Sequence, residues 1–184
     1  MRSCLSPVLT LPCLLLSMGF LSSCGGGVKQ AGKPAAPLSN NAYRAEGLCA
    51  FEIPAGWTIA EFPGLKYRIV HAQPTNGFAP NLNVVEEKNT MDIKNYAAAC
   101  QKSLEQTFKD FRLDNSVEFM TNAGASGFRI TYTATQNEKL VRIAQYLFDS
   151  GKDTKIIVTF TRLDTQDVNL DAQVDEKLMT FIVE

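Results

Sequence analysis

The chain has 184 residues, 45% of them hydrophobic, and its 18 basic side chains nearly balance 19 acidic ones at a formal net charge of −1. This length and apolar content suffice for one globular domain with a substantial core. The balanced charge lacks the basic footprint of nucleic-acid-binding proteins, so we expect no nucleic-acid partner.

The N-terminal segment, residues 1–23, has the organisation of a secretory signal peptide. Arg2 is its only charged residue, and a largely apolar stretch runs from Val8 to Leu21. This stretch is shorter than the roughly 20 residues that a membrane-spanning helix needs. A basic start followed by a short apolar region is typical of an export signal, so we expect the protein to leave the cytoplasm.

The signal ends in Leu21-Ser22-Ser23-Cys24, which is similar to a bacterial lipobox. In that family of signals a peptidase cuts before the cysteine, whose thiol carries a diacylglycerol. The alternatives are an ordinary signal with an incidental cysteine, or a buried apolar helix. Lipidation of Cys24 predicts stable anchoring to a membrane. By resemblance to the lipoproteins of diderm bacteria, Gly25 favours the outer membrane.

After the cysteine the composition changes to Gly, Ala and Pro, which is typical of a flexible tether. We therefore predict three segments. Residues 1–23 are the lipoprotein signal peptide, residues 24–42 are the lipidated cysteine and tether, and residues 43–184 form a single domain on the extracytoplasmic, or periplasmic, side of the envelope.

The first half of the domain combines short strands with one long helix. Trp57 follows a Pro54-Ala-Gly56 turn and is expected to be buried. Asp92 can cap the helix, whose stripe from Ile93 to Phe108 faces a sheet and includes Tyr96, Ala97, Cys100 and Leu104. Strands are expected at residues 48–53, 58–62, 66–71 and 81–87.

The second half supplies the centre of the sheet. Three consecutive antiparallel strands are predicted at residues 127–134, 140–148 and 155–163, with another strand before them at 111–120. A last helix at 170–182 buries Leu170, Val174, Leu178 and Phe181. Long antiparallel runs with only two helices indicate an α+β fold: an antiparallel sheet of about six to seven strands flanked by two main helices.

Five short segments together resemble the DcrB and PsbP-like superfamily. They are Phe51-x-Ile53-Pro54-x-x-Trp57, Pro80-Asn81-Leu82-Asn83-Val84, Tyr132-Thr133, Gln145-x-x-Phe148 and Ile157-Val-Thr-Phe160. The resemblance covers most of residues 43–184 and implies an α/β/α sandwich. Members include bacterial envelope lipoproteins, a photosystem II subunit and a nuclear-import factor. The family therefore implies an accessory, non-catalytic role with no cofactor.

The residues that usually carry catalysis or metal binding are sparse. His71 is the only histidine, so no histidine pair for a metal and no Ser-His-Asp triad can form. Asp167-x-Asn169-x-Asp171 matches the opening of a calcium loop, but the later glycine and glutamate are missing. We expect these acids to solvate a loop and to place negative charge at the start of the last helix. No metal site is predicted.

Two arginines on neighbouring strands, Arg129 and Arg142, are expected to share one sheet face with a threonine stripe. This face is predicted either to be the solvated side of the sheet, which we favour, or to bind an anion or another ligand. The stripe consists of Thr131, Thr133, Thr159 and Thr161.

Besides Cys24, the mature chain keeps two cysteines. Cys49 has the same strand parity as Phe51 and Ile53, and Cys100 lies in the apolar stripe of the long helix. If that helix covers the face of Phe51 and Ile53, a disulfide can form in an oxidising compartment. The alternative is two buried thiols that act as small hydrophobes.

These observations together predict a lipid-anchored, non-catalytic envelope protein. Its partners are expected to be the membrane, through the N-terminal lipid, and an envelope protein for which it acts as an interaction or assembly-accessory module. The alternative is a carrier of a small ligand, with a pocket between sheet and helix.

Overall fold

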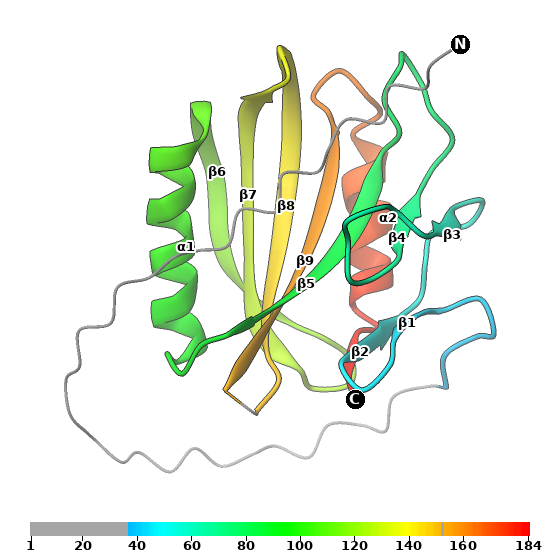
Figure 1. The fold of residues 1–184 in the computed structure, drawn as a ribbon, viewed down its shortest axis with the longest axis vertical. Helices are drawn as coiled ribbons and strands as arrows, with labels where there is room; N and C mark the ends of the chain where they lie inside the picture. Colours follow the sequence, from blue (N-terminus) through cyan, green and yellow to red (C-terminus); the bar gives the residue numbers. More distant parts are fainter. Residues whose placement is uncertain (1–36, 152) are drawn as a thin grey trace.

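A seven-stranded antiparallel sheet runs through the computed structural model, which describes residues 37–151 and 153–184. Its strand order is β3-β4-β5-β9-β8-β7-β6, so the predicted meander runs from the central strand β9 through β8 to β7, beside the edge strand β6 (Figure 1). The strands are β3 (Thr58–Ala60), β4 (Ile69–His71), β5 (Asn81–Lys88), β6 (Lys109–Met120), β7 (Ser126–Gln136), β8 (Lys139–Asp149) and β9 (Thr154–Leu163).

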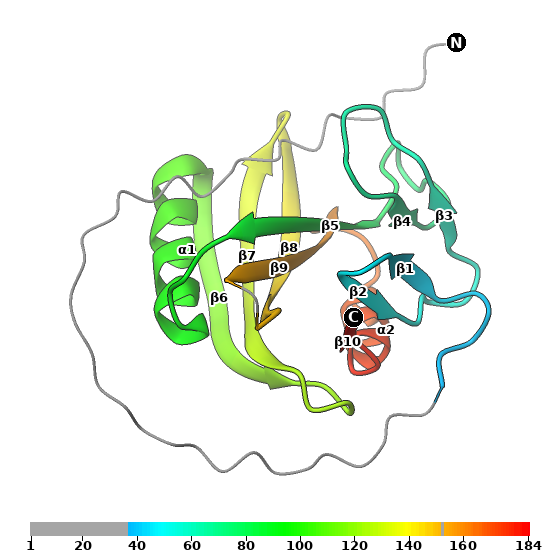
Figure 2. The ribbon, with the colours of Figure 1, turned by 60° about the horizontal axis from the view of Figure 1, so that its bottom comes forward.

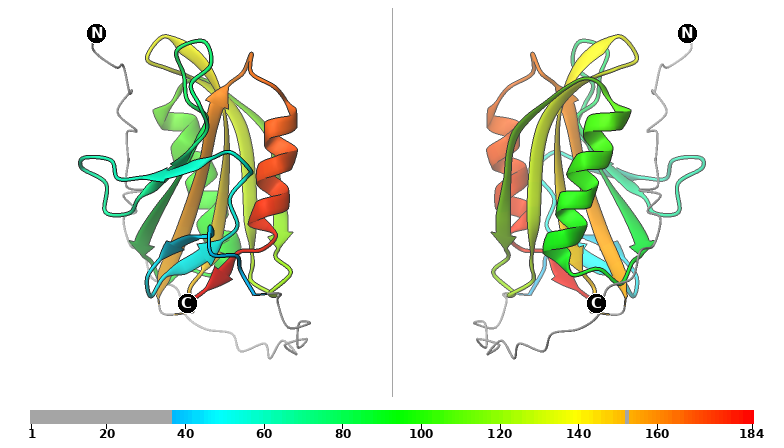
Figure 3. Two further views of the ribbon diagram at one scale, coloured as in Figure 1. Left: turned by 90° about the vertical axis from the view of Figure 1, so that its right-hand side faces the viewer. Right: turned by 90° about the vertical axis from the view of Figure 1, so that its left-hand side faces the viewer.

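Two helices complete the predicted α+β architecture, which is confirmed. Helix α1 (Ile93–Thr107) and helix α2 (Asn169–Leu178) lie on opposite sides of the large sheet (Figure 3). Helix α1 begins where the sequence indicates, because the Asp92 carboxylate accepts the backbone N–H of Asn95 at 2.9 Å. Tyr96, Ala97 and Cys100 are the buried residues of its stripe.

A second, three-stranded sheet was not expected from the sequence. Strands β1 (Tyr43–Ala45) and β10 (Ile182–Val183) pair on either side of β2 (Cys49–Phe51), as Figure 2 shows near the C-terminus. The predicted helix through residue 182 is therefore too long. Helix α2 ends at Leu178, where the Thr180 hydroxyl donates to the Lys177 carbonyl at 2.6 Å and accepts the Glu52 N–H.

The large sheet separates two hydrophobic cores because side chains alternate between its faces. Helix α1 covers the first core, with Ile130 and Tyr132 of β7 and Ile143 of β8. Helix α2 and the small sheet cover the second. The second core contains Tyr43, Phe51, Tyr146, Phe148, Val158, Phe160, Val174, Leu178 and Phe181.

Trp57 belongs to the second core, and its predicted burial is confirmed at 8% exposure. Its ring centroid lies 6.1 Å from that of Phe160. The backbone N–H of Trp57 donates to the Pro54 carbonyl, and Gly56 between them has φ +80°, a conformation that favours glycine. The Pro54 turn thus aims the indole at the sheet. Within the described ranges, neither helix combines the length and hydropathy of a membrane span.

Candidate functional site

The most strongly linked charged groups lie between helix α2 and the large sheet. Asp171 and Asp175 are one helical turn apart on α2, and they face arginines on β7, β8 and β9. We call this cluster the arginine seam; it consists of Arg129, Arg142, Arg162, Asp114, Asp171, Asp175 and Tyr146.

Arg162 is the buried centre of the arginine seam, with 1% exposure. Its Nε and Nη2 atoms donate to the two carboxylate oxygens of Asp171 at 2.6 and 2.8 Å. Its Nη1 atom donates to the carbonyls of Leu163, Asp164 and Gln166 at 3.0 to 3.2 Å. The hydrogen bonds that Arg162 donates to the Asp171 carboxylate raise the pKa of Arg162, so the guanidinium stays charged. The sequence does not distinguish Arg162, because it lies near the end of a strand in which polar and apolar residues alternate in the usual way.

The two arginines that the sequence did single out also join the seam. Arg142 donates to Asp171 at 2.9 Å and lies 2.7 Å from Asp114 of β6. Arg129 forms an ion pair with Asp175, which also accepts the hydroxyl hydrogen of Tyr146. Burial, followed by the Asp175 charge, raises the pKa of Tyr146 above its ordinary value.

This arrangement corrects the predicted arginine and threonine surface. Arg129 and Arg142 are on one face with Thr131 and Thr133, but carboxylates of α2 neutralise them, so the face is neither simply solvated nor an open anion site. Thr159 and Thr161 lie on the opposite face, because they pair with Gln145 and Ile143 of β8. Asp171, predicted to solvate a loop, pairs with Arg162, although it does occupy the first turn of α2.

Thr159 belongs to a polar row on the α1 face of the sheet. Asn83 of β5, Thr159 of β9 and Gln145 of β8 occupy one row across three adjacent strands. Asn83 is only 5% exposed. No hydrogen bond joins any of these three side chains to another residue of the described ranges. Among the described residues, Arg129 Nε is the one fully buried side-chain nitrogen or oxygen without a partner. The amide of Asn83 therefore keeps some solvent contact, where water or a neutral polar ligand can bind.

The outer edge of β6 is a second accessible feature. Strand β6 pairs only with β7 among the described strands and ends the large sheet. Two register shifts interrupt the pairing before Asn115, and the stretch Asn115–Met120 is regular. Val117 and Met120 on this stretch are among the exposed large hydrophobic residues. The edge is therefore long, locally regular and partly apolar.

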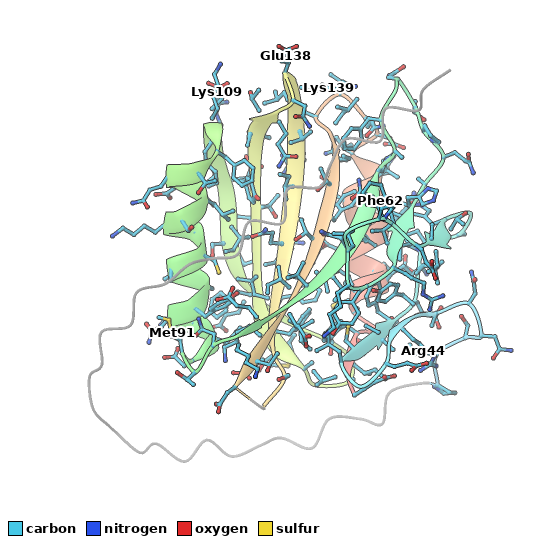
Figure 4. The ribbon with its side chains drawn as sticks, in the orientation of Figure 1. Arg44, Phe62, Met91, Lys109, Glu138 and Lys139 are labelled. Carbon is cyan, nitrogen blue, oxygen red and sulfur yellow. The ribbon has the colours of Figure 1, made fainter. Side chains whose placement is uncertain are left out.

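An open hollow lies at the loop of residues 61–68, and the described residues form no metal centre. The loop of residues 61–68 projects from the body of the domain (Figure 3) and encloses an open hollow of about 490 Å³. Phe62 lies in this loop (Figure 4). His71 lies at the end of β4 with its Nδ1 3.1 Å from the Ala72 carbonyl oxygen. No cluster of metal-ligating side chains exists within the described ranges.

Glu86 and Glu87 point to opposite faces of β5, as their adjacent positions predict. Glu86 pairs with Lys66, whose hydrogen bond lowers the pKa of the Glu86 carboxyl. Glu87 accepts the hydroxyl hydrogen of Tyr96 on α1 at 2.9 Å. The two carboxylates therefore act separately, each as a structural partner.

The two cysteines of the domain lie in different cores. Cys49 packs in the α2-side core and Cys100 in the α1-side core, so the sheet separates them and no disulfide joins them. The geometric condition for the predicted bridge fails because α1 covers the face opposite to Phe51 and Ile53. Burial, followed by the charge of Glu184, raises the pKa of the Cys49 thiol to about 12. Cys24 lies outside the described residues.

Comparison with solved structures finds proteins of similar fold. LpqN of Mycobacterium tuberculosis, described as involved in cell envelope biogenesis, has a TM-score of 0.57 at 14% identity, covering 73% of this chain and 82% of its own. The cyanobacterial PsbP of Synechocystis, CyanoP, has a TM-score of 0.53 at 14% identity, covering 89% of this chain and 99% of its own. The chain has the PsbP-like fold.

A protein of unknown function from Pseudomonas aeruginosa, PA94, has the same fold at a TM-score of 0.53 and 12% identity, covering 73% of this chain and 90% of its own. No protein-family model and no curated protein sequence matches the chain. The PsbP-like part of the sequence resemblance is thus confirmed for the fold, and the likeness to DcrB stays a prediction.

Proposed function

We propose that the protein is a lipid-anchored, non-catalytic accessory protein of the cell envelope, and that its domain binds a protein partner. The free edge of β6 is the observation that carries this proposal. An exposed edge strand offers unpaired backbone groups to an added strand, and proteins usually blunt such edges unless they use them. The exposed Val117 and Met120 supply apolar contacts beside those groups.

The proposed anchor rests on the sequence Leu21-Ser22-Ser23-Cys24 and on the tether of residues 24–42. The description of LpqN as an envelope-biogenesis protein supports an envelope role for a chain of the same fold. A flexible tether of this length spans about 25 Å on average between the membrane surface and the domain. The signal peptide and Gly25 favour the extracytoplasmic side, at the outer membrane in a diderm cell.

A non-catalytic role is supported by how the described charged groups are used. The strongest acid–base contacts, those of the arginine seam, hold α2 on the sheet. His71 contacts a backbone carbonyl, the Glu86–Lys66 pair lies beside Tyr67, and no cluster of metal-ligating side chains exists within the described ranges. We take these contacts to be structural rather than catalytic.

Substitution of Cys24 by alanine tests the anchor. We expect the wild-type protein to partition into detergent and its N-terminal peptide to carry the mass of a diacylglycerol-modified cysteine. Cys24→Ala should stay in the aqueous phase or remain unprocessed. Unchanged detergent partitioning, with no lipid mass on the wild-type peptide, would contradict the proposed anchor.

Photo-crosslinking tests the binding edge. A photoreactive residue at position 118 on β6 should give defined protein adducts in intact membranes, whereas the same residue at Lys102, on the outer face of α1, serves as the matched control. Adducts of equal amount at both positions, or at neither, would argue against β6 as the binding surface.

The polar row favours a second candidate, a carrier of a neutral polar ligand. Asn83 is nearly buried and its amide has no protein hydrogen-bond partner in the described ranges. Native mass spectrometry of gently purified protein should then detect a small molecule of constant mass, and Asn83→Leu should remove it. If the protein shows only its own mass, both when purified from cells and after incubation with libraries of small polar molecules, this alternative is wrong.

A further inference from the structure

The backbone groups that β6 presents outward can be assigned residue by residue. The Thr121 N–H donates to the Ala125 carbonyl at 2.9 Å, which makes this pair hydrogen-bonded. Hydrogen-bonded and non-hydrogen-bonded pairs alternate along antiparallel strands. Val117 and Phe119, paired with Arg129 and Gly127, therefore direct their backbone groups toward β7. The alternate residues Ser116, Glu118 and Met120 direct their backbone groups outward.

The part of this edge that can accept another strand is short and well bounded. On one side the register shift between Leu113 and Asn115 interrupts the pairing, and on the other side the chain turns after Met120. Figure 4 labels Lys109 at the far, irregular end of β6, and β6 pairs only with β7 among the described strands. The usable edge is Asn115–Met120, which contains one charged residue, Glu118.

We propose that this edge binds a second copy of the same chain, with β6 pairing antiparallel to β6 of the partner about a twofold axis at Val117. The inference rests on the proposed function, since it names the first partner of the β6 edge. The two large sheets then continue into each other, and the exposed Val117 side chains meet at the axis. Such an isologous contact uses the same residues on both copies.

The twofold register follows from charge and strand length. Outward-facing residues must oppose outward-facing residues to form hydrogen bonds. An axis at Glu118 would place the two Glu118 carboxylates opposite each other, which is destabilising. An axis at Ser116 would oppose Glu118 to Asp114 in the irregular segment, and one at Phe119 would extend past the end of the strand. An axis at Val117 opposes each Ser116 to Glu118 of the other copy.

The proposed anchor explains why a second copy is the favoured occupant. An edge of six residues forms few backbone hydrogen bonds and a contact below the size of a stable soluble dimer. Tethering copies to one membrane raises their effective concentration and compensates for weak pairing. The dimer is therefore expected on the membrane and at high protein concentration, and it dissociates on dilution of the detached domain.

Cysteine crosslinking tests this register. Across an antiparallel non-hydrogen-bonded pair the α-carbons are about 4.5 Å apart, within the range of a disulfide. Val117→Cys in membranes should therefore give a covalent dimer under mild oxidation. Glu118→Cys is the matched control, because two residues of offset separate its α-carbons beyond about 7 Å. We expect at least tenfold more dimer from Val117→Cys. Wild type, whose Cys49 and Cys100 are buried, should give none.

A proline at the same edge provides the second variant. Because the Glu118 N–H points outward, Glu118→Pro removes a donor that β7 does not use, and edge strands tolerate such a proline. Added to Val117→Cys, it should abolish the crosslink while the thermal unfolding midpoint stays close to that of the parent. More dimer from Glu118→Cys than from Val117→Cys would overturn the register, and absence of dimer from both would overturn the self-association. Defined heterologous adducts at position 118 would in that case leave the proposed function standing.

Discussion

Removing the negative charge of Asp171 is expected to destabilise the domain more than any other conservative change in the arginine seam. Asp171→Asn keeps the side-chain volume but takes away the carboxylate that lies 2.6 Å from Nε of Arg162. Breaking a buried ion pair from one side costs about 3–5 kcal/mol, because the remaining charge is buried and unpaired. The three carbonyls around Nη1 of Arg162 remain, so we expect a loss of about 3 kcal/mol, at the lower end of that range.

The assay is urea unfolding followed by the fluorescence of Trp57, the only tryptophan of the chain. Asp175→Asn is the matched control, since its partner Arg129 is 23% exposed and can take up water. Loss of that pair and of the Tyr146 hydrogen bond should cost about 1–2 kcal/mol. Equal losses for both variants, or a loss below about 1 kcal/mol for Asp171→Asn, would refute the argument from burial.

Removing both charges separates the ion pair from the packing around it. In Arg162→Met with Asp171→Leu, no buried charge is left unpaired, and well-packed apolar replacements of buried pairs are often neutral or stabilising. The double variant should therefore be more stable than Asp171→Asn by about 2 kcal/mol or more. Arg142 keeps Asp114 as a partner in this background. A double variant as unstable as the single one would show that the geometry of the pair, rather than its desolvation, determines stability.

Two further predictions concern the packing of the sheet. Trp57→Ala should cost about 3–5 kcal/mol in the unfolding free energy because it opens a cavity against Phe160; a red-shifted, solvent-quenched tryptophan emission from the native protein would contradict this burial. Gly127→Ala should lower the free energy of unfolding by about 1–3 kcal/mol or more. A Cβ atom there would lie 2.0 Å from the Leu147 carbonyl oxygen and would push β7 away from β8. Its control is Ser126→Ala at the exposed neighbouring position, and an equal melting temperature for the two variants would exclude the proposed clash.

The sequence predicts those parts of the fold whose signals are local. The carboxylate of Asp92 and the apolar stripe of the following residues locate α1, and alternation locates β7, β8 and β9. The small sheet is missed because β1 and β10 have only three and two residues, too few for a period. The end of α2 is misjudged because Phe181 continues the apolar spacing after the helix has ended.

The candidate sites depend on lateral register, which a single strand does not contain. Alternation correctly groups Arg129 with Thr131 and Thr133, but the turn between β8 and β9 decides that Thr159 opposes Gln145 and not Arg142. The pairing of Cys49 with Cys100 likewise required knowing which face α1 covers. That face is set by the order β5-β9-β8-β7-β6, in which α1 connects β5 to the distant edge strand β6.

The two edges of the large sheet differ in a way that bears on partner binding. At one edge β3 has three residues, too short to template another strand. At the other edge β6 has twelve residues, and bulges disturb only its first half. Bulges and charged side chains are the usual protection of an edge strand, and the first half of β6 carries both. The regular stretch Asn115–Met120 carries Glu118 alone, and that charge disfavours the one twofold register in which two copies of Glu118 oppose each other. The charge of Glu118 therefore disfavours one register of strand pairing and leaves the other registers of the β6 edge available.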